Sequence, residues 1–173
     1  KTLPLSWRLV REMHQMLLRG VRGQYKTPGE FRTSQNWIGG PSIETATFVP
    51  PPPHAMQDAL SDLEKFFHDK SRKFPPLIKA GLIHAQFETI HPFLDGNGRT
   101  GRLLITFYLY KEGILTQPLL YISEFFKKYR QDYYDKLNGY RFNNGVENWL
   151  KFFLEGVRTV SEEAVTTAQK ITK

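Results

Sequence analysis

The hydrophobic positions of this 173-residue chain recur mostly at the three- and four-residue spacing that is typical of amphipathic helices. The first apolar stripe predicts a helix that ends at the glycine-containing stretch 20–23. Its members are Leu5, Leu9, Met13, Met16 and Leu17. A second stripe predicts a helix that ends before Pro75 and Pro76. Its members are Met56, Leu60, Leu63, Phe66 and Phe67.

Four more helices are predicted in the second half of the chain. Residues 77–88 are apolar on most faces, which indicates a buried central helix. A second buried helix is expected over 103–111, closed near Gly113. Ser123 is the expected N-cap of a helix over 124–137. The apolar stripe of a last long helix consists of Trp149, Phe152, Phe153 and Val157.

Residues 24–53 interrupt the helical pattern. This segment is rich in Gly, Pro, Ser and Thr, so it predicts a loop with short strands. Within it, 42–49 indicates a short β element, because it carries several β-prone residues. These are Thr45, Thr47, Phe48 and Val49. The whole pattern therefore predicts a mainly helical, all-α fold.

Length and composition predict one folded domain over residues 1–173. Hydrophobic residues make up 40% of the chain and aromatic residues 14%, which excludes an intrinsically disordered segment. No apolar run reaches membrane-spanning length, so no membrane partner is expected. The chain opens at Lys1 rather than at a methionine, and we expect it to be a fragment of a longer protein.

Cysteine content and charge narrow the picture further. The chain has no cysteine, which excludes disulfides and thiolate metal sites and fits a reducing, cytoplasmic location. Its formal net charge of +7 at pH 7 favours an anionic partner, which is a nucleotide, a nucleic acid or an acidic protein face. The charge does not choose among these, so candidate chemistry must come from individual residues.

The stretch HPFLDGNGRTGR collects groups suited to chemistry on a nucleotide phosphate. His91 supplies an imidazole, whose ordinary pKa near ~6.5 suits a general base at neutral pH. Asp95 is a carboxylate of the kind that Mg²⁺ binds together with substrate phosphates. The glycines on either side of Asn97 allow a tight turn that points backbone N–H groups at an anion, where a helix is expected to begin. Arg99 and Arg102 add fork-shaped donors for phosphate oxygens.

Several of these residues also have a purely structural interpretation. His91 can cap the preceding helix, and Asp95 can form an Asx-type turn before Gly96. Phe93 is interpreted as a core anchor that holds the loop. The remaining histidines have no such context and are interpreted as structural or solvated. They are His14, His54, His68 and His84.

The stretch resembles the motif of the Fic family, His-Pro-Phe-x-(Asp/Glu)-Gly-Asn-Gly-Arg-x-x-Arg, and every specified position is filled. The segments 28–32 and 35–40 resemble the family's stretch ahead of the active-site flap, and 46–53 resembles the exit of the flap. The segment 84–90 resembles the helix that leads into the motif. This resemblance covers nearly the whole chain. It implies a Fic fold, in which central buried helices flank the motif turn and a short β-hairpin forms the flap.

The resemblance also implies an activity, the transfer of AMP from ATP to a hydroxyl side chain (Ser, Thr or Tyr) of a target protein. It implies that His91 is the general base and that Asp95 holds Mg²⁺ against the diphosphate. Tyr134 lies where the family has an adenine-side tyrosine, although it also belongs to an aromatic helix stripe of the kind that usually packs in a core. The expected phosphate-binding residues are Gly96, Asn97, Gly98, Arg99, Thr100, Gly101 and Arg102.

The implied partners are ATP and a target protein that docks on the flap, 42–49, as an added strand, with automodification as a further expectation. Many Fic proteins carry an inhibitory Ser/Thr-x-x-x-Glu-Gly/Asn helix, whose glutamate pairs with the second motif arginine. The sequence has no match to it, so we expect any such element outside these residues. DNA binding is expected only through a domain outside this chain, and the sequence predicts no oligomeric state.

Three functions stay open at this point. The first is a protein adenylyltransferase, which the unaltered Gly96-Asn97-Gly98-Arg99 turn favours over phosphotransferase relatives. The second uses the same residues with another donor and transfers UMP, GMP or phosphocholine. The third is a nucleotide-sensing or DNA-associated regulatory module, which the positive charge permits. The intact base, metal ligand and anion turn argue against a purely binding role.

Overall fold

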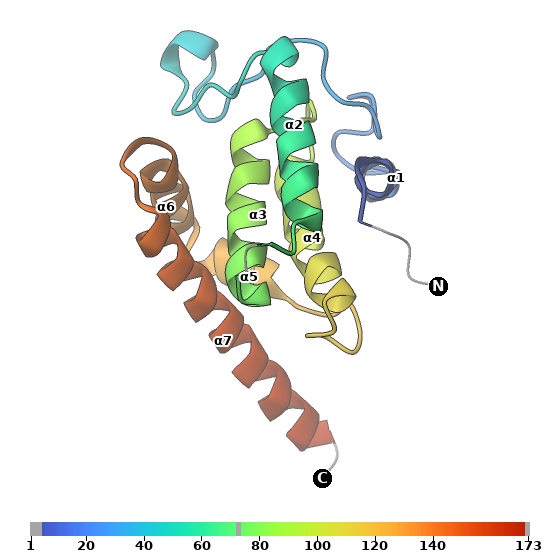
Figure 1. Ribbon diagram of the computed structural model, residues 1–173, viewed down its shortest axis with the longest axis vertical. Helices are drawn as coiled ribbons and strands as arrows, with labels where there is room; N and C mark the ends of the chain where they lie inside the picture. Colours follow the sequence, from blue (N-terminus) through green and yellow to red (C-terminus); the bar gives the residue numbers. More distant parts are fainter. Residues whose placement is uncertain (1–4, 72–73, 172–173) are drawn as a thin grey trace.

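The computed structural model describes residues 5–71 and 74–171, and within them the fold is built from α-helices with no β-sheet (Figure 1). The predicted all-α class is therefore confirmed. The helices are α1 (Trp7–Leu17), α2 (Pro53–His68), α3 (Pro76–Ile90), α4 (Asn97–Lys111), α5 (Ile122–Lys128), α6 (Arg130–Phe142) and α7 (Val146–Ile171), with a 3₁₀ helix η1 at Ile43–Thr45.

Helices α3 and α4 form the centre of the molecule, as the apolar runs at 77–88 and 103–111 predicted. Helix α3 packs against α4, α2, α6 and α7, so it meets neighbours on all sides (Figure 1). Its Ile83 and Phe87 are fully buried, as is Leu104 of α4. Each such side chain contributes roughly 1.5–3 kcal/mol by leaving water. The core is therefore assembled around the two helices that flank the motif.

Helix α1 begins later than its apolar stripe suggests. Ser6 is its N-cap, and the Ser6 hydroxyl accepts the N–H of Leu9 at 3.4 Å. The prediction that Met16 belongs to the buried face is wrong, because Met16 is 77% exposed. The buried polar residue of this helix is His14, which faces the motif turn.

The predicted helix over 124–137 is wrong in its boundaries, because two helices occupy this region. Tyr129 is the C-cap of α5 and the N-cap of α6, with φ −107° and ψ 46°. The break lets Phe125 of α5 pack on Phe152 of α7 (ring centroids 5.2 Å apart) while Tyr133 of α6 reaches into the core. Ser123 caps neither helix, and the N-cap of α5 is Tyr121.

The flap carries less β structure than the sequence predicts. A single antiparallel bridge joins Ile38 to Phe48: the Ile38 N–H donates to the Phe48 carbonyl at 2.9 Å, and the Phe48 N–H donates back at 3.1 Å. Beyond this bridge the tip folds into η1, so Thr45 is helical and not extended. The expected hairpin is thus a loop pinned by one bridge.

Helix α7 is the longest, and its last turns extend past the other helices (Figure 1). Residues 161–170 are exposed, whereas Trp149 and Phe153 in its first half are fully buried. None of the helices formed by the described residues is both long and apolar enough to cross a membrane.

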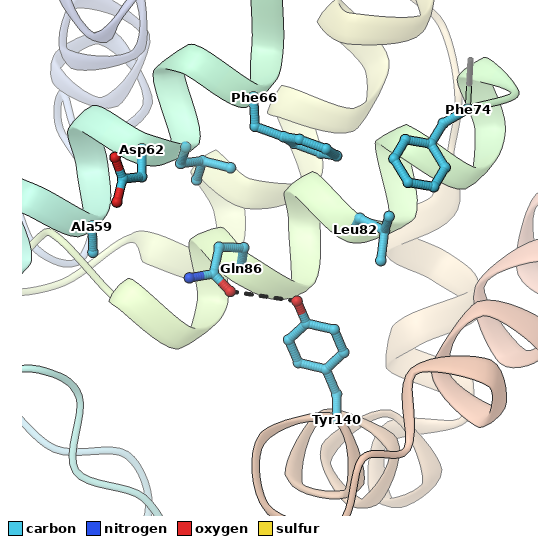
Figure 2. A pocket seen from close by; sticks show the side chains of 8 residues that line it. Ala59, Asp62, Phe66, Phe74, Leu82, Gln86 and Tyr140 are labelled. Atoms are coloured by element: carbon cyan, nitrogen blue, oxygen red, sulfur yellow. Dashed lines mark hydrogen bonds between the residues drawn. The ribbon is translucent and has the colours of Figure 1, made fainter. Parts of the chain in front are cut away.

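A mainly apolar pocket of about 450 Å³ opens between α2, α3 and α6 (Figure 2). Phe66 and Leu82 line it, and at one end the Tyr140 hydroxyl donates to Gln86 Oε1 at 3.4 Å. None of the residues that line this pocket belongs to the HPFLDGNGRTGR motif.

Candidate active site

Residues 91–96 connect the C-terminal end of α3 to the N-terminal end of α4. Gly96 is the N-cap of α4 with φ +83°, a left-handed conformation that glycine adopts without strain. A Cβ at this position would lie 3.0 Å from Leu18 and 3.1 Å from His14. Thr100 closes the first helical turn, since its backbone N–H and its hydroxyl both donate to the Gly96 carbonyl at 3.0 Å.

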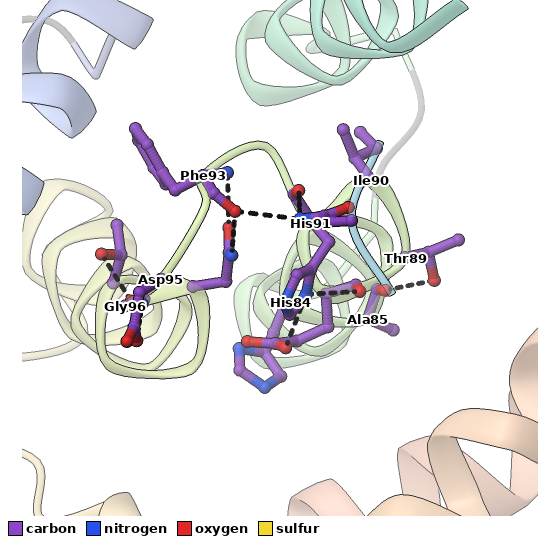
Figure 3. A network of polar contacts seen from close by, with 12 residues as sticks. His84, Ala85, Thr89, Ile90, His91, Phe93, Asp95 and Gly96 are labelled. Atoms are coloured by element: carbon purple, nitrogen blue, oxygen red, sulfur yellow. Dashed lines mark hydrogen bonds and ion pairs between the residues drawn. The ribbon is translucent and has the colours of Figure 1, made fainter. Parts of the chain in front are cut away.

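Asn97 clamps the turn from within. Its Oδ1 accepts the N–H of Phe93 at 2.9 Å, and its Nδ2 donates to the Phe93 carbonyl at 2.7 Å. Phe93 is fully buried, which confirms its interpretation as the core anchor of the loop (Figure 3). Both polar atoms of the Asn97 side chain are thus bonded to Phe93, so the groups that the turn can present to an anion are its backbone N–H groups. The amides of Asn97, Gly98 and Arg99 precede the first intrahelical hydrogen bond of α4.

His14 of α1 holds the same turn from the other side. The backbone N–H of Gly29 donates to His14 Nδ1 at 2.8 Å, so the proton of the neutral ring is on Nε2, which donates to the Asp95 carbonyl at 2.8 Å. The ring is stacked on Phe93 with centroids 3.7 Å apart. Burial lowers the pKa of His14 and keeps it in this neutral form. His14 is structural, as predicted.

Arg32 and Asn36, from the loop ahead of the flap, fix the backbone of the motif. Arg32 is almost fully buried, and its Nε donates to the His91 carbonyl at 3.0 Å. Asn36 Nδ2 donates to the carbonyls of His91 at 3.2 Å and Phe93 at 3.0 Å. These bonds satisfy carbonyls that a helix end leaves without intrahelical donors. The peptide that carries His91 is therefore held by two side chains from a distant segment.

His91 caps α3, as its structural interpretation predicted, and its role as a general base stays a prediction. It is the C-cap of α3 in the left-handed region, with φ 49° and ψ 60°, which costs a non-glycine residue about 1–2 kcal/mol. Its Nδ1 lies 3.3 Å from the Glu88 carbonyl (Figure 3). A carbonyl only accepts, so Nδ1 carries the proton and Nε2 keeps its lone pair. Burial, with the charge of Arg141 nearby, lowers the pKa of His91 to about 3, so the ring is neutral at pH 7.

Asp95 combines a turn role with an accessible carboxylate. Its Oδ1 accepts the N–H of the next residue, Gly96, at 2.5 Å, whereas the predicted Asx-type turn would bond the N–H two residues on, at Asn97. The same carboxylate faces Arg99 at 3.6 Å and Arg22 at 3.5 Å, and 27% of its side-chain surface is exposed. Ion pairs of this length at the surface contribute little free energy, so Asp95 Oδ2 is available to bind a ligand.

The two motif arginines, three residues apart on α4, bond to different neighbours. Arg99 donates to the Arg22 carbonyl at 2.9 Å, beside Asp95. Arg102 Nε donates to Ser123 Oγ at 3.0 Å and lines a pocket of about 300 Å³ between α4, α5 and α6. The pocket combines positive charge with aromatic rings. Its lining residues are Arg102, Ser123, Phe126, Lys127, Arg130, Tyr133 and Tyr134.

The comparisons with known proteins bear directly on this arrangement. The sequence profile of the Fic/DOC family matches residues 4–109, which is more than half of the chain and includes the turn between α3 and α4. The chain belongs to the Fic/DOC family. It is 37% identical over 110 residues to the protein adenylyltransferase Fic of Aedes aegypti. It is 32% identical over 112 residues to a probable protein adenylyltransferase of Aquifex aeolicus.

Both relatives are longer than the matched region. The matches cover 63% and 64% of this chain but only 19% of the mosquito protein and 32% of the Aquifex protein. A crystal structure of a Fic family protein from Desulfovibrio desulfuricans superimposes with a TM-score of 0.80 at 26% identity, over 94% of this chain and 48% of that one. A Fic-1 fragment from Caenorhabditis elegans has a TM-score of 0.68 at 24% identity, over 98% of this chain and 45% of that one. The Fic fold predicted from the motif is therefore confirmed.

The structure brings most of the predicted Fic site residues to the N-terminal end of α4. His91, Asp95 and Arg99 lie around the turn, and Arg102 and Tyr134 share the neighbouring pocket. Tyr134 is 39% exposed, so the aromatic stripe of α6 buries Tyr133 and leaves Tyr134 at the pocket. Thr100 and Gly101 are buried behind the turn, and their predicted contact with a nucleotide stays a prediction.

Two residues near the Fic motif had no predicted role. Glu88, one helical turn before His91, is buried with its carboxyl beside Gly101. Arg141 of α6 donates to the Glu88 carbonyl at 3.0 Å, and its guanidinium lies 4.1 Å from the ring centroid of flap residue Phe48. A signal for Glu88 exists in the sequence, since His84, Glu88 and His91 follow helical spacing along a mostly apolar helix. Arg141 has none, because its contacts are distant in sequence.

Proposed function

We propose that this chain is the transferase domain of a protein adenylyltransferase and moves AMP from ATP to a hydroxyl side chain of a target protein. The observation that carries the proposal is the neutral Nε2 of His91 beside a turn whose first amides, on Asn97 and Gly98, have no helical acceptor. Two relatives of the matched region bear the name of this activity, which supports it. We propose residues 1–173 as one Fic domain, in line with the 94% of the chain that superimposes on a Fic protein.

His91 acts on the acceptor. With its proton on Nδ1, the ring presents the lone pair of Nε2 to an incoming hydroxyl and removes the proton as the hydroxyl oxygen attacks the α-phosphorus. Arg32 and Asn36 donate to the His91 carbonyl and so fix the backbone that carries the ring. A fixed ring favours one geometry for the attack of the hydroxyl on the α-phosphorus.

The turn and the arginines hold the nucleotide in this proposal. The amides of Asn97, Gly98 and Arg99 face the α- and β-phosphates at the positive end of the α4 dipole. Arg102 binds the terminal phosphate from the adjoining pocket, where Tyr134 offers an exposed ring to the adenine base. The cationic pocket thus fits a molecule that is anionic at one end and aromatic at the other.

A magnesium ion fits the donor set at Asp95. The described residues contain no cluster of three or more His, Asp or Glu side chains for a metal, whereas Mg²⁺ characteristically uses one or two carboxylates with substrate phosphates and water. We therefore propose Asp95 as the protein ligand of a magnesium ion that arrives with ATP. When bound, the ion would neutralise the negative charge of the departing pyrophosphate.

The flap is the proposed docking surface for the target. Its exposed side chains include Ile43 and Val49, and the exposed Trp37 precedes the bridge of Ile38 and Phe48, so apolar surface lies beside that bridge. A target segment that pairs with this edge would bring a hydroxyl side chain toward the motif. The contact of Arg141 with Phe48 links the flap to the helix that carries His91.

The test is incubation of the purified chain with Mg²⁺ and ATP labelled on the α-phosphate, alone and with lysate proteins. We expect label on the chain itself or on a lysate protein. His91→Ala should lose ~10²–10⁴-fold in rate, the usual contribution of a general base, while it still binds ATP. The matched control is His54→Ala, an exposed histidine of α2, which should keep the wild-type rate.

Parallel reactions separate the alternatives. Label transferred from the γ-phosphate would indicate phosphoryl transfer, and faster transfer from UTP, GTP or CDP-choline would identify another donor. A His91→Ala variant that transfers at the wild-type rate would contradict the assignment of the base.

A further inference from the structure

Glu88 is a buried acid without a structural explanation. It is 5% exposed, and its Oε1 has no hydrogen-bond partner within the part of the chain that the structure describes. A buried carboxyl oxygen is normally bonded, and leaving one without a partner costs free energy. An acid that served only to hold the fold would be expected to have both oxygens satisfied.

The other oxygen of Glu88 faces the proposed base. Glu88 Oε2 lies 3.7 Å from His91 Nδ1, the nitrogen that carries the proton of the neutral ring. In this state the Nδ1–H is nearer to the Glu88 backbone carbonyl, at 3.3 Å. A second proton, on Nε2, would give the ring a positive charge and strengthen its attraction to the carboxylate, because charge-assisted hydrogen bonds are shorter and stronger than neutral ones.

Space for this carboxyl depends on Gly101, at one of the unspecified positions between the two motif arginines. A Cβ at Gly101 would lie 2.7 Å from Glu88 Oε1, so any larger residue there would displace the carboxyl. Charged and titratable groups face Glu88 from each helix packed on it. They are His84 and His91 of α3 itself, Arg102 of α4, and Tyr133 and Arg141 of α6.

We propose that Glu88 is a positioning residue for AMP transfer. Its carboxylate accepts a hydrogen bond from the Nδ1–H of His91 when the ring becomes an imidazolium. The inference rests on the proposed function. The acceptor hydroxyl gives its proton to His91 Nε2 while its oxygen bonds to the α-phosphorus, and the bond from that phosphorus to the bridging oxygen of the pyrophosphate breaks. Glu88 balances the new positive charge until His91 releases the proton to solvent. Burial raises the pKa of Glu88 to about 7, so the carboxylate forms near neutral pH.

Glu88→Gln keeps the shape of the side chain and removes the charge, so it is the decisive variant. We expect kcat for AMP transfer to fall about tenfold to a hundredfold, the effect of one to two pKa units on the base, with the KM for ATP unchanged. The wild-type rate should rise with pH through about 7 as Glu88 ionises, and this rise should be absent in Glu88→Gln. Glu88→Asp, which keeps a carboxylate, should recover part of the rate and the rise. Glu163→Gln, at the exposed end of α7, is the matched control.

A readout without ATP, magnesium or acceptor separates this inference from the proposed function. Acylation of His91 by diethyl pyrocarbonate, followed by peptide mass spectrometry, reports the nucleophilicity of Nε2. It should be slower in Glu88→Gln, with the exposed His54 and His68 as internal standards.

If Glu88→Gln slows the acylation of His91 but the wild type transfers no AMP, the pairing of Glu88 with His91 would stand and the adenylyltransferase activity would be rejected. Transfer by the wild type with an unchanged kcat in Glu88→Gln would overturn the inference and leave the proposed function in place. A lower kcat with an unchanged pH profile and unchanged acylation would show a structural role only, and would also overturn it.

Discussion

At the scale of residues, the motif holds its turn with some polar atoms and leaves others for the proposed chemistry. His91 ends α3 and presents Nε2, and Asp95 holds the turn with Oδ1 and presents the rest of its carboxylate. The Asn97 side chain bonds to the backbone of Phe93, and its own backbone N–H remains available to the proposed anion site. Structural and catalytic interpretations of these residues are therefore compatible, because different atoms of one residue can serve the two roles.

Asp95→Asn separates the two roles of Asp95. The amide oxygen can still accept the Gly96 N–H, so the turn should persist, while the negative charge that a metal needs is lost. AMP transfer should fall by at least about 100-fold, since a metal clamp on the leaving group is worth several kcal/mol. Titration of activity with Mg²⁺ is the measurement, and Asp62→Asn on the exposed face of α2 is the control. An unchanged magnesium dependence would place the metal ligand elsewhere.

At the scale of elements, the unit that matters is α3, the turn and α4, held by segments that are far away in the sequence. His14 of α1 bonds the Asp95 carbonyl, and Arg32 and Asn36 bond the His91 carbonyl. A short loop with many satisfied carbonyls is rigid, and preorganised donors around a turn cost little reorganisation on binding an anion. The hydrogen bonds of the flap, by contrast, join its own residues to one another and to Ile38.

Gly96→Ala tests how strongly this element depends on its turn. Alanine at φ +83° should cost about 1–2 kcal/mol of unfolding free energy, and the contacts of its Cβ with Leu18 and His14 add to that. ATP affinity should fall as well, because the amides of the turn shift. Gly139→Ala in α6 is the matched control: its Cβ meets no atom within 4 Å, so stability should stay or rise by up to ~1 kcal/mol. Urea unfolding that found the two variants equally stable would contradict the role of Gly96.

At the scale of the whole molecule, buried ionisable groups set the response to pH. Burial lowers the pKa of His84 and of His91 to about 3, so the unfolded chain binds more protons between pH 6.5 and 3, and stability falls as pH falls through that window. Each contributes about 3 kcal/mol of loss by pH 4. The raised pKa of Glu88 acts oppositely and returns about 3 kcal/mol between pH 7 and 4.5, so a net loss of about 3 kcal/mol remains.

Urea unfolding at pH 7.5 and pH 4 measures this loss. His84 is fully buried, and its Nε2 lies 3.0 Å from the Tyr133 hydroxyl. His84→Gln should lower stability at pH 7.5 yet lose less of it at pH 4 than the wild type does. His54→Gln, on the exposed surface of α2, should keep the wild-type difference. The same loss in His84→Gln as in the wild type would mean that other groups control acid unfolding.

The sequence by itself determined the local features of this protein. Long apolar runs identified α3 and α4, because a helix that is hydrophobic on most faces has to be buried. The motif HPFLDGNGRTGR identified the family and the residues of the turn, because its glycines and charges act within one short stretch. These features are legible because they depend on neighbours in the chain.

Only the tertiary structure decided what depends on residues far apart in the chain. The break between α5 and α6 at Tyr129 accompanies the packing of Phe125 on Phe152 of α7. The spacing of apolar residues in the sequence does not reveal a single non-helical residue. His14 and Arg32 donate to carbonyls of the motif, and Arg141 contacts Phe48, so these contacts join segments that are distant in the chain. The exposure of Met16 likewise depends on which residues pack around α1. The burial of Glu88 depends on distant segments too, since Gly101 of α4 and Arg141 of α6 lie against it, and burial raises its pKa to about 7.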